Sequence, residues 1–239
     1  RMIAPENGKP RLQDAITAYR SALRERSLEN SPRLWANTQN NLGTTLIKLG
    51  DELNNIRNFD EGIAAFHEAL QIRTRDRTPM FWANTVNNLG NALAELGLRL
   101  NDSSRIREAI KMFRESLLER ARERVPQKWA DTQNNIGSAL WKLGILEGNP
   151  VYLKDAIIAH QQALEVKTRE NAPLQWARTI ERLAWVESTL GNLTQDVSYW
   201  RAALSHAEEA LEEYRIANST DDIKDATELR DDLTAKLSL

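Results

Sequence analysis

The side chains of this sequence that could carry acid–base or metal chemistry are scattered along the chain. Its three histidines are His67, His160 and His206, and it contains no cysteine. No histidine has carboxylates at the spacing of a metal site. No glycine-rich loop joins a strand to a helix, as a phosphate site requires. We therefore predict no catalytic site, no metal and no cofactor, and we expect that the chain is not an enzyme in its own right.

Asparagine is the residue type whose spacing does suggest chemistry. A side-chain amide donates and accepts hydrogen bonds, as the backbone of an extended peptide does. With 100° per residue, positions 37, 40, 44, 47 and 48 lie opposite Leu42 on one helix. The same face is polar in later segments, where it contains several further asparagines. Because asparagine is a poor residue for a helix interior, this column requires a structural or functional reason.

The elements that position these residues are repeats of constant length. Four tryptophans lie at a constant step of 47 residues, and prolines, threonines and glycines follow the same step: Trp35, Trp82, Trp129 and Trp176; Pro32, Pro79, Pro126 and Pro173; Thr38, Thr85, Thr132 and Thr179; Gly50, Gly97, Gly144 and Gly191. A fixed period of this size indicates a solenoid, in which each unit buries its apolar face against its neighbours.

Each repeat is predicted to contain two helices, so the fold class is all-α. Helix A spans about 32–50 and its copies, and its proline suits a first helical turn. Helix B spans about 58–76, with an apolar stripe at Ile63, Phe66, Ala69 and Leu70. We expect a long connection between them at 51–58. The four repeated tryptophans are predicted to pack between units. His160 takes the position of Phe66, so we favour a core role for it.

These residues carry a family resemblance. Asn41-Leu42-Gly43-Thr44-Thr45-Leu46, Gly50, Gly62-Ile63-Ala64-Ala65-Phe66 and Ala69-Leu70 resemble the tetratricopeptide repeat, whose usual unit has about 34 residues. The phrase Thr-Gln-Asn-Asn-Leu-Gly is similar to kinesin light chain-like and bacterial tetratricopeptide arrays. The resemblance implies a right-handed α-α superhelix in which helix A lines a concave groove and asparagines contact a bound peptide.

The resemblance gives the polar face of helix A the role of a peptide-binding groove. Its candidate residues are Asn37, Asn40, Lys48, Asn84, Asn87, Asn91, Asp131, Asn134, Trp141, Arg178, Glu181 and Trp185. The alternative is that the asparagines bond neighbouring helices and fix the stacking of the repeats. For Asn41, Asn88 and Asn135, nearer the side of the helix, we favour the structural role.

A basic column accompanies the repeats. It comprises Arg26, Arg73, Arg120 and Lys167, together with Arg75, Arg122 and Arg169. These cations are expected to complement the C-terminal ends of B helices. The alternative is an anion-binding seam.

The domain organisation follows from the period. Residues 1–10 are expected to form a flexible segment and 11–217 the solenoid, which starts with a helix B at 11–27 and continues with units at 32–78, 79–125, 126–172 and 173–217. Residues 218–239 are predicted to form a capping helix with a polar outer face. No helix A precedes 11–27, so we expect a truncated N-terminus and self-association through this unpaired helix.

The charge balance narrows the classes of partner. The chain has 32 basic and 34 acidic residues, for a net charge of −2. Nucleic acid and anionic membranes attract basic surfaces, so we expect neither as a partner. No apolar run approaches the roughly 18 residues of a membrane-spanning helix, and we expect a cytoplasmic protein.

Three functions remain open from the sequence. The leading one is a scaffold module that binds a protein or peptide in the groove. The second is a regulatory or sensor segment of a larger enzyme, such as a protease or a nucleotide-dependent switch, whose catalytic domain lies outside this chain. The third is a self-assembling structural scaffold, in which open repeat ends stack head to tail.

Overall fold

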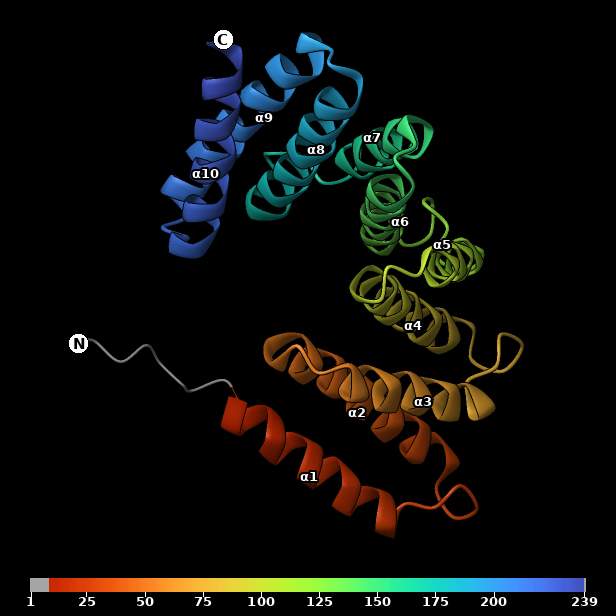
Figure 1. Cartoon of the computed structure of the whole chain (residues 1–239). Helices are drawn as coiled ribbons and strands as arrows, with labels where there is room; N and C mark the ends of the chain where they lie inside the picture. Colours follow the sequence, from red (N-terminus) through yellow and green to blue (C-terminus); the bar gives the residue numbers. More distant parts are fainter. Residues whose placement is uncertain (1–8, 239) are drawn as a thin grey trace, which may run out of the picture. The chain divides into compact units, whose positions relative to one another are not determined.

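The computed structural model describes residues 9–238, which form α-helices joined by short connections and contain no β-strand (Figure 1). The helices of this described part are α1 Lys9–Glu25, α2 Pro32–Leu53, α3 Ile56–Ile72, α4 Pro79–Arg99, α5 Ser103–Leu117, α6 Pro126–Glu147, α7 Pro150–Leu164, α8 Pro173–Thr194, α9 Val197–Ile216 and α10 Thr220–Leu237. They belong to two compact units, one ending at Glu119 and one beginning at Arg120. The predicted all-α solenoid class is confirmed.

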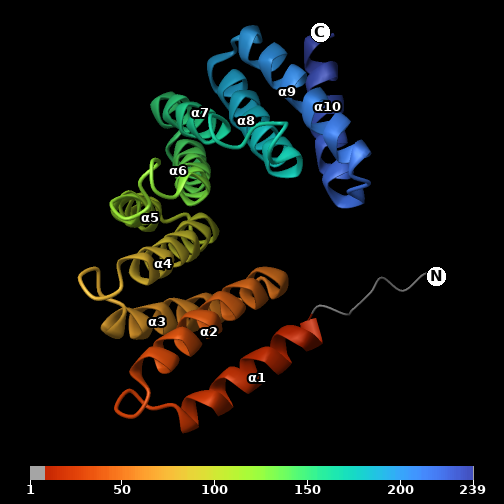
Figure 2. The same ribbon diagram turned by 180° about the vertical axis from the view of Figure 1, so that it is seen from behind.

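Each unit is built from antiparallel helix pairs (Figures 1 and 2). In unit 1, α2 pairs with α3 and α4 with α5, and α1 packs on α2. In unit 2, α6 pairs with α7 and α8 with α9, and α10 packs on α9. Every A helix (α2, α4, α6 and α8) starts with a proline, whose missing N–H has no intrahelical partner at that position in any case.

The connection from helix A to helix B is short, so the prediction of a long connection at 51–58 is wrong. Only Asn54 and Asn55 separate α2 from α3. Asn54 adopts the left-handed conformation with φ of 49°, and the side chain of Asn55 accepts a hydrogen bond from Arg57 N at 3.0 Å. Asparagine favours both conformations, which turn the chain without a loop. The additional residues of the repeat lengthen helix A and the connection from B to A.

In each of the first three full repeats, a glycine in the middle of helix A allows a close approach to helix B. A Cβ at Gly43 would lie 2.8 Å from Phe66 Cε1 and 2.9 Å from Gly62 O. The same position pairs Gly90 with Phe113 and Gly137 with His160. Where the fourth repeat has Ala184 in place of glycine, the aromatic position is held by Ala207, and these two alanines share a buried cluster. The core role predicted for His160 agrees with its complete burial.

The repeated tryptophans are half-buried, and the fully buried residue of each first turn is the alanine that follows. An arginine of the preceding B-to-A connection stacks on the rings of Trp82, Trp129 and Trp176, whereas Leu28 holds this position before Trp35. Arg122 lies 5.2 Å from the ring centroid of Trp129, and Arg169 lies 5.4 Å from that of Trp176. The same arginines form ion pairs with glutamates near the end of the following B helix, Arg122 with Glu165 at 2.6 Å. These three tryptophans therefore pack at the edge of their repeats under a cation.

The terminal helices complete the two units. Ile16 of α1 is buried against Leu42 and Leu46 of α2, so the apolar face that we predicted to be unpaired has a partner within unit 1. Helix α10 buries Leu229 and Leu233 against α9, while acidic side chains such as that of Asp221 are exposed. Of the segment predicted to be flexible, residues 1–8 lie outside the described residues.

Candidate functional site

The exposed face of helix A differs from the face that we predicted. In α2, Asn37, Asn41, Thr44 and Lys48 are exposed, whereas Asn40 is half-buried. Ile47, which the arc placed on the polar face, points toward α3, because a Cβ at Gly62 would meet its Cδ1 at 2.7 Å. The exposed face is thus rotated by roughly half a residue step from the side opposite Leu42.

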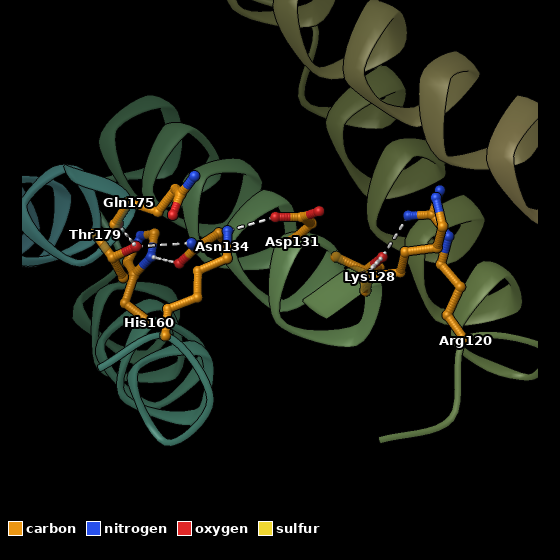
Figure 3. A network of polar contacts seen from close by, with 9 residues as sticks. Arg120, Lys128, Asp131, Asn134, His160, Gln175 and Thr179 are labelled. Atoms are coloured by element: carbon orange, nitrogen blue, oxygen red, sulfur yellow. Dashed lines mark hydrogen bonds and ion pairs between the residues drawn. The ribbon is translucent and has the colours of Figure 1, made fainter. Parts of the chain in front are cut away.

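The column at position 40 connects one A helix to the next. Asn40 Oδ1 lies 3.0 Å from Thr85 Oγ1 and 3.4 Å from Asn88 Nδ2. In unit 2, Asn134 Nδ2 donates to Thr179 Oγ1 at 2.9 Å, and Asn134 Oδ1 lies 3.0 Å from His160 Nδ1 (Figure 3). Asn134 is 3% exposed and Asn87 is 6% exposed. These contacts favour the stacking role for the position-40 asparagines.

His160 supports Asn134 as a neutral group. Burial, followed by the charge of Arg182, lowers the pKa of His160 to about 3. A neutral imidazole has one N–H, and the neighbouring amide oxygen places it on Nδ1. Nε2 then packs on Gly137 without a hydrogen-bond partner. This histidine therefore acts as a core side chain with one internal hydrogen bond.

The residues at position 37 and its copies form polar contacts within the protein, and for Asn37 and Asp131 the partner is a cation that follows helix B. Asn37 Oδ1 accepts a hydrogen bond from Arg73 Nη2 at 2.7 Å, and Asp131 forms an ion pair with Lys167. Arg178 forms one with Asp222 of α10 at 3.1 Å. Asn84 is half-buried and also has a polar partner. These residues lie at the edge of the exposed face, and their side chains already form hydrogen bonds or ion pairs within the protein.

The cations at the repeat position of Arg73 form part of the repeat packing, and all of them except Arg26 are buried. Arg73 Nη1 donates to Thr85 Oγ1 at 2.6 Å, and Arg120 Nη1 donates to Thr132 Oγ1 at 2.8 Å. Arg26 makes the corresponding bond to Thr38 at 3.1 Å. Lys167, at the same repeat position, pairs with Asp131 instead of a threonine. The first set of the basic column therefore binds groups of the protein itself, and the second set stacks on tryptophan.

The remaining predicted residues fall into two groups. Lys48 and Asn91 are exposed, and Trp185 is 36% exposed. Trp141 is half-buried and its Nε1 donates to Thr189 Oγ1 at 2.9 Å. Glu181 accepts a hydrogen bond from the Tyr214 hydroxyl at 2.7 Å, and burial raises the pKa of both groups. Glu181 therefore belongs to the packing of α8 on α9.

Unit 2 contains a polar cavity of about 340 Å³ on the exposed face of its A helices. Residues from α6 and α8 line it, together with Lys167. Three of them come from the predicted set: Asp131, Asn134 and Arg178. Asn135, Gln175 and Arg182 were not predicted as site residues. The sequence feature that points to them is the polar repeat position of Asn41, Asn88, Asn135 and Arg182. We predicted a structural role for its asparagines.

Neither a metal site nor a membrane span is found within residues 9–238. No three His, Cys, Asp or Glu side chains of this part lie close enough to hold a metal ion. None of its helices combines the length and the apolar character needed to cross a bilayer.

Comparison with known proteins supports the fold alone. No protein-family model and no curated protein match the sequence. Among solved structures, the crystal structure of BtubC (BKLC) from P. vanneervenii is similar, with a TM-score of 0.55 and 20% sequence identity over 87% of this protein and 75% of that one. The protein is therefore a helical-repeat protein in its architecture.

Proposed function

We propose that this protein is a tetratricopeptide-type docking module, without catalytic activity of its own, and that it binds a peptide segment of another protein on the exposed face of its A helices. The polar cavity between α6 and α8 is the observation that carries this proposal. Its lining offers amide donors and acceptors from Asn135 and Gln175, and charges of both signs. An extended peptide presents the complementary backbone groups.

Helix α8 adds an apolar anchor beside this polar surface. Arg178, Arg182 and Trp185 follow one another at spacings of four and three residues, so they lie on one face of the helix. Trp185 is the exposed large aromatic side chain of this face. Tryptophan and arginine dominate the residues on which binding free energy concentrates in protein interfaces. The same face therefore offers a hydrogen-bonding cavity and a hydrophobic contact.

The rest of the A-helix surface supports this assignment. The asparagines at position 40 form hydrogen bonds to the next A helix, and these bonds fix the relative positions of the exposed residues on consecutive A helices. In unit 1 that stripe contains Asn41, Thr44 and Lys48, which are polar and exposed. The mixed charges fit a ligand that is neither strongly acidic nor strongly basic on this face.

Selection from a peptide library tests the proposal. Random linear dodecapeptides displayed on phage are panned on the whole protein, and enriched peptides are measured against R182N/W185S. This double variant gives α8 the residues that α6 has at the same repeat positions, Asn135 and Ser138. We expect enrichment of specific peptides and loss of their binding to the variant. No enrichment, or equal binding by both proteins, would contradict the proposal.

A further inference from the structure

Unit 1 contains a second cavity, of about 480 Å³, which the proposed function does not use. It lies where the first turns of α2 and α4 meet the end of α3. Its apolar lining includes Ala36, Ile72, Pro79, Met80 and Phe81. Phe81 is 54% exposed, so the apolar wall continues to the surface.

Three arginines line this apolar cavity: Arg33, Arg73 and Arg77. Arg33 and Arg77 are exposed and form no ion pair within the described part of the protein. No carboxylate belongs to the lining formed by residues 9–238. The cavity therefore combines an apolar wall with an excess of positive charge, and such a combination attracts an anion attached to an apolar group.

Arg73 presents an unused donor at this place. Its side chain is 7% exposed, and its two Nη atoms bond Thr85 and Asn37. Its Nε is buried without a hydrogen-bond partner, and burial lowers the pKa of the guanidinium. Arg120 has the same unpartnered Nε, so this feature belongs to the repeat position. Arg73 differs from Arg120 in that it lines an open cavity together with Arg33 and Arg77.

The N-terminus of α4 contributes further positive potential. Thr78, Pro79, Met80 and Phe81 all line the cavity. The Thr78 side chain does not cap the helix, because its hydroxyl donates to Thr74 O at 3.4 Å. The first-turn N–H groups and the helix dipole therefore favour an acceptor at this end.

We propose that this cavity binds a peptide segment in which a carboxylate lies next to a bulky apolar side chain. The carboxylate accepts hydrogen bonds from Arg33, Arg77 and Arg73 Nε, and the apolar side chain packs on Met80 and Phe81. This inference rests on the proposed function, peptide docking, and adds a second subsite of defined chemistry. The carboxylate comes either from the C-terminus of the bound peptide or from an acidic side chain.

Unit 2 provides an internal comparison for this subsite. At the positions of Arg33, Arg77 and Phe81, its repeat has Gln127, Asn171 and Gln175. The cation at the position of Arg73 is Lys167, which forms an ion pair with Asp131. The variant R33Q/R77N/F81Q thus removes the subsite with side chains that the same fold already accepts at equivalent positions.

Binding of defined peptides tests the inference. The probes are fluorescein-labelled octapeptides Gly-Ser-Gly-Ser-Gly-Ser-Glu-Phe, with a free or amidated C-terminus, and versions with Gln for Glu or Ser for Phe. Fluorescence anisotropy with the whole protein at 150 mM salt gives each dissociation constant. We expect the Glu-Phe free acid to bind at least tenfold tighter than the neutral Gln-Phe amide or the Glu-Ser peptide.

The variants locate the binding. R33Q/R77N/F81Q, checked for unchanged helical circular dichroism, should weaken Glu-Phe binding at least tenfold, whereas R182N/W185S should leave it unchanged. In ¹⁵N-arginine-labelled protein, the Arg73 Nε–H signal, assigned with R73K, should shift on binding. Retained affinity of the Glu-Phe amide identifies the side-chain carboxylate as the source, and its loss identifies the C-terminus.

Three results would overturn the inference: equal binding of the Glu-Phe free acid and the neutral Gln-Phe amide, unchanged affinity of R33Q/R77N/F81Q, or no shift of the Arg73 signal at saturation. Peptides selected on the A-helix face would still bind in each of these cases. Failure of the subsite is therefore separable from failure of the proposed function.

Discussion

Asn134 of α6 donates from Nδ2 to Thr179 Oγ1 of α8 at 2.9 Å, and this bond joins two consecutive repeats of unit 2. The other end of the same amide lies 3.0 Å from His160 Nδ1 on α7. One buried amide thus connects three helices (Figure 3). The asparagines at this repeat position, for which the sequence predicts peptide binding, therefore hold neighbouring repeats together.

Replacement of this amide should be costly for stability. N134A removes the donor to Thr179 Oγ1, whose hydroxyl still donates to Gln175 O, and leaves His160 Nδ1 without a partner. Each lost hydrogen bond costs about 0.5–1.5 kcal/mol, and a buried group left unsatisfied costs about 1–3 kcal/mol. We expect about 2–3 kcal/mol of destabilisation in urea unfolding. N91A, at an exposed position of α4, is the control and should change stability by less than about 0.5 kcal/mol. Equal effects of both variants would contradict the fastening role.

The pairing of Gly137 with His160 should show strong coupling. A Cβ at Gly137 would lie 2.7 Å from His160 Nε2, so G137A forces the helices apart, at about 1–3 kcal/mol. G137A/H160A reproduces the alanine pair of the fourth repeat, Ala184 and Ala207. In a double-mutant cycle we expect the double variant to be at least about 1 kcal/mol more stable than the sum of the single effects. Additive effects would mean that the glycine is not required by its aromatic partner.

The stacked cations should stabilise the tryptophans measurably. Arg122 lies over Trp129 and pairs with Glu165. W129A should cost about 2–3 kcal/mol, less than the 3–5 kcal/mol of a fully buried aromatic, because the ring is half-buried. In a thermal or urea unfolding cycle, R122A and W129A should couple by about 0.5–1 kcal/mol. A coupling of zero would show that the arginine only covers the ring.

The two partly or fully buried histidines of unit 2 should give opposite pH dependences. The pKa of His160 is lowered to about 3 in the folded protein, whereas the ordinary pKa of histidine is about 6.5. Between these two pH values the side chain therefore binds a proton in the unfolded protein but not in the folded protein. Its contribution to stability is present above pH 6.5 and is lost as the pH falls, by up to about 1.4 kcal/mol per unit. H160F, which introduces the residue of Phe66, should flatten this acid slope.

His206 acts in the other direction. Although burial opposes its charge, its hydrogen bond to Glu187 at 2.8 Å and the charges of Glu187 and Glu209 raise its pKa on balance. Its contribution is therefore complete below about pH 6.5 and is lost as the pH rises through the raised value. Unfolding of wild type, H160F and H206Q between pH 4.5 and 8.5 separates the two slopes. An acid slope that H160F leaves unchanged would exclude His160 as its source.

The period of the repeat made the fold predictable, and the limits of prediction came from polar residues with buried partners. Proline at the first turn and the constant step located all four A helices. The A-to-B connection was predicted too long, because Asn54 and Asn55 form a tight turn and a helix cap. Thr85 and Asn134 are polar and buried, so polarity alone placed the centre of the exposed face roughly half a residue step from its position in the structure.

The repeat pattern of the sequence did not predict the two cavities, and the reason again lies in how helix A packs. A helix packed on three sides has an exposed stripe that one apolar arc does not define, so Asn135 was assigned to packing and Arg182 was missed. The arginine cavity depends on Arg33 and Phe81, which differ from their copies in the other repeats, and on Arg77, which recurs as Arg124. The repeat pattern gives little information on positions whose residue differs between repeats. A binding site can nevertheless form at such positions without loss of the fold.

The affinity of a library-selected peptide for α8 variants is the most direct test of peptide docking on the A-helix face. Loss of a tryptophan hot spot costs about 2 kcal/mol or more, which is about a 30-fold change in the dissociation constant. We predict at least this loss for R182N/W185S and a change below twofold for I158A, which gives exposed Ile158 of α7 the residue of Ala64. Equal affinities of wild type and R182N/W185S would contradict the proposed function.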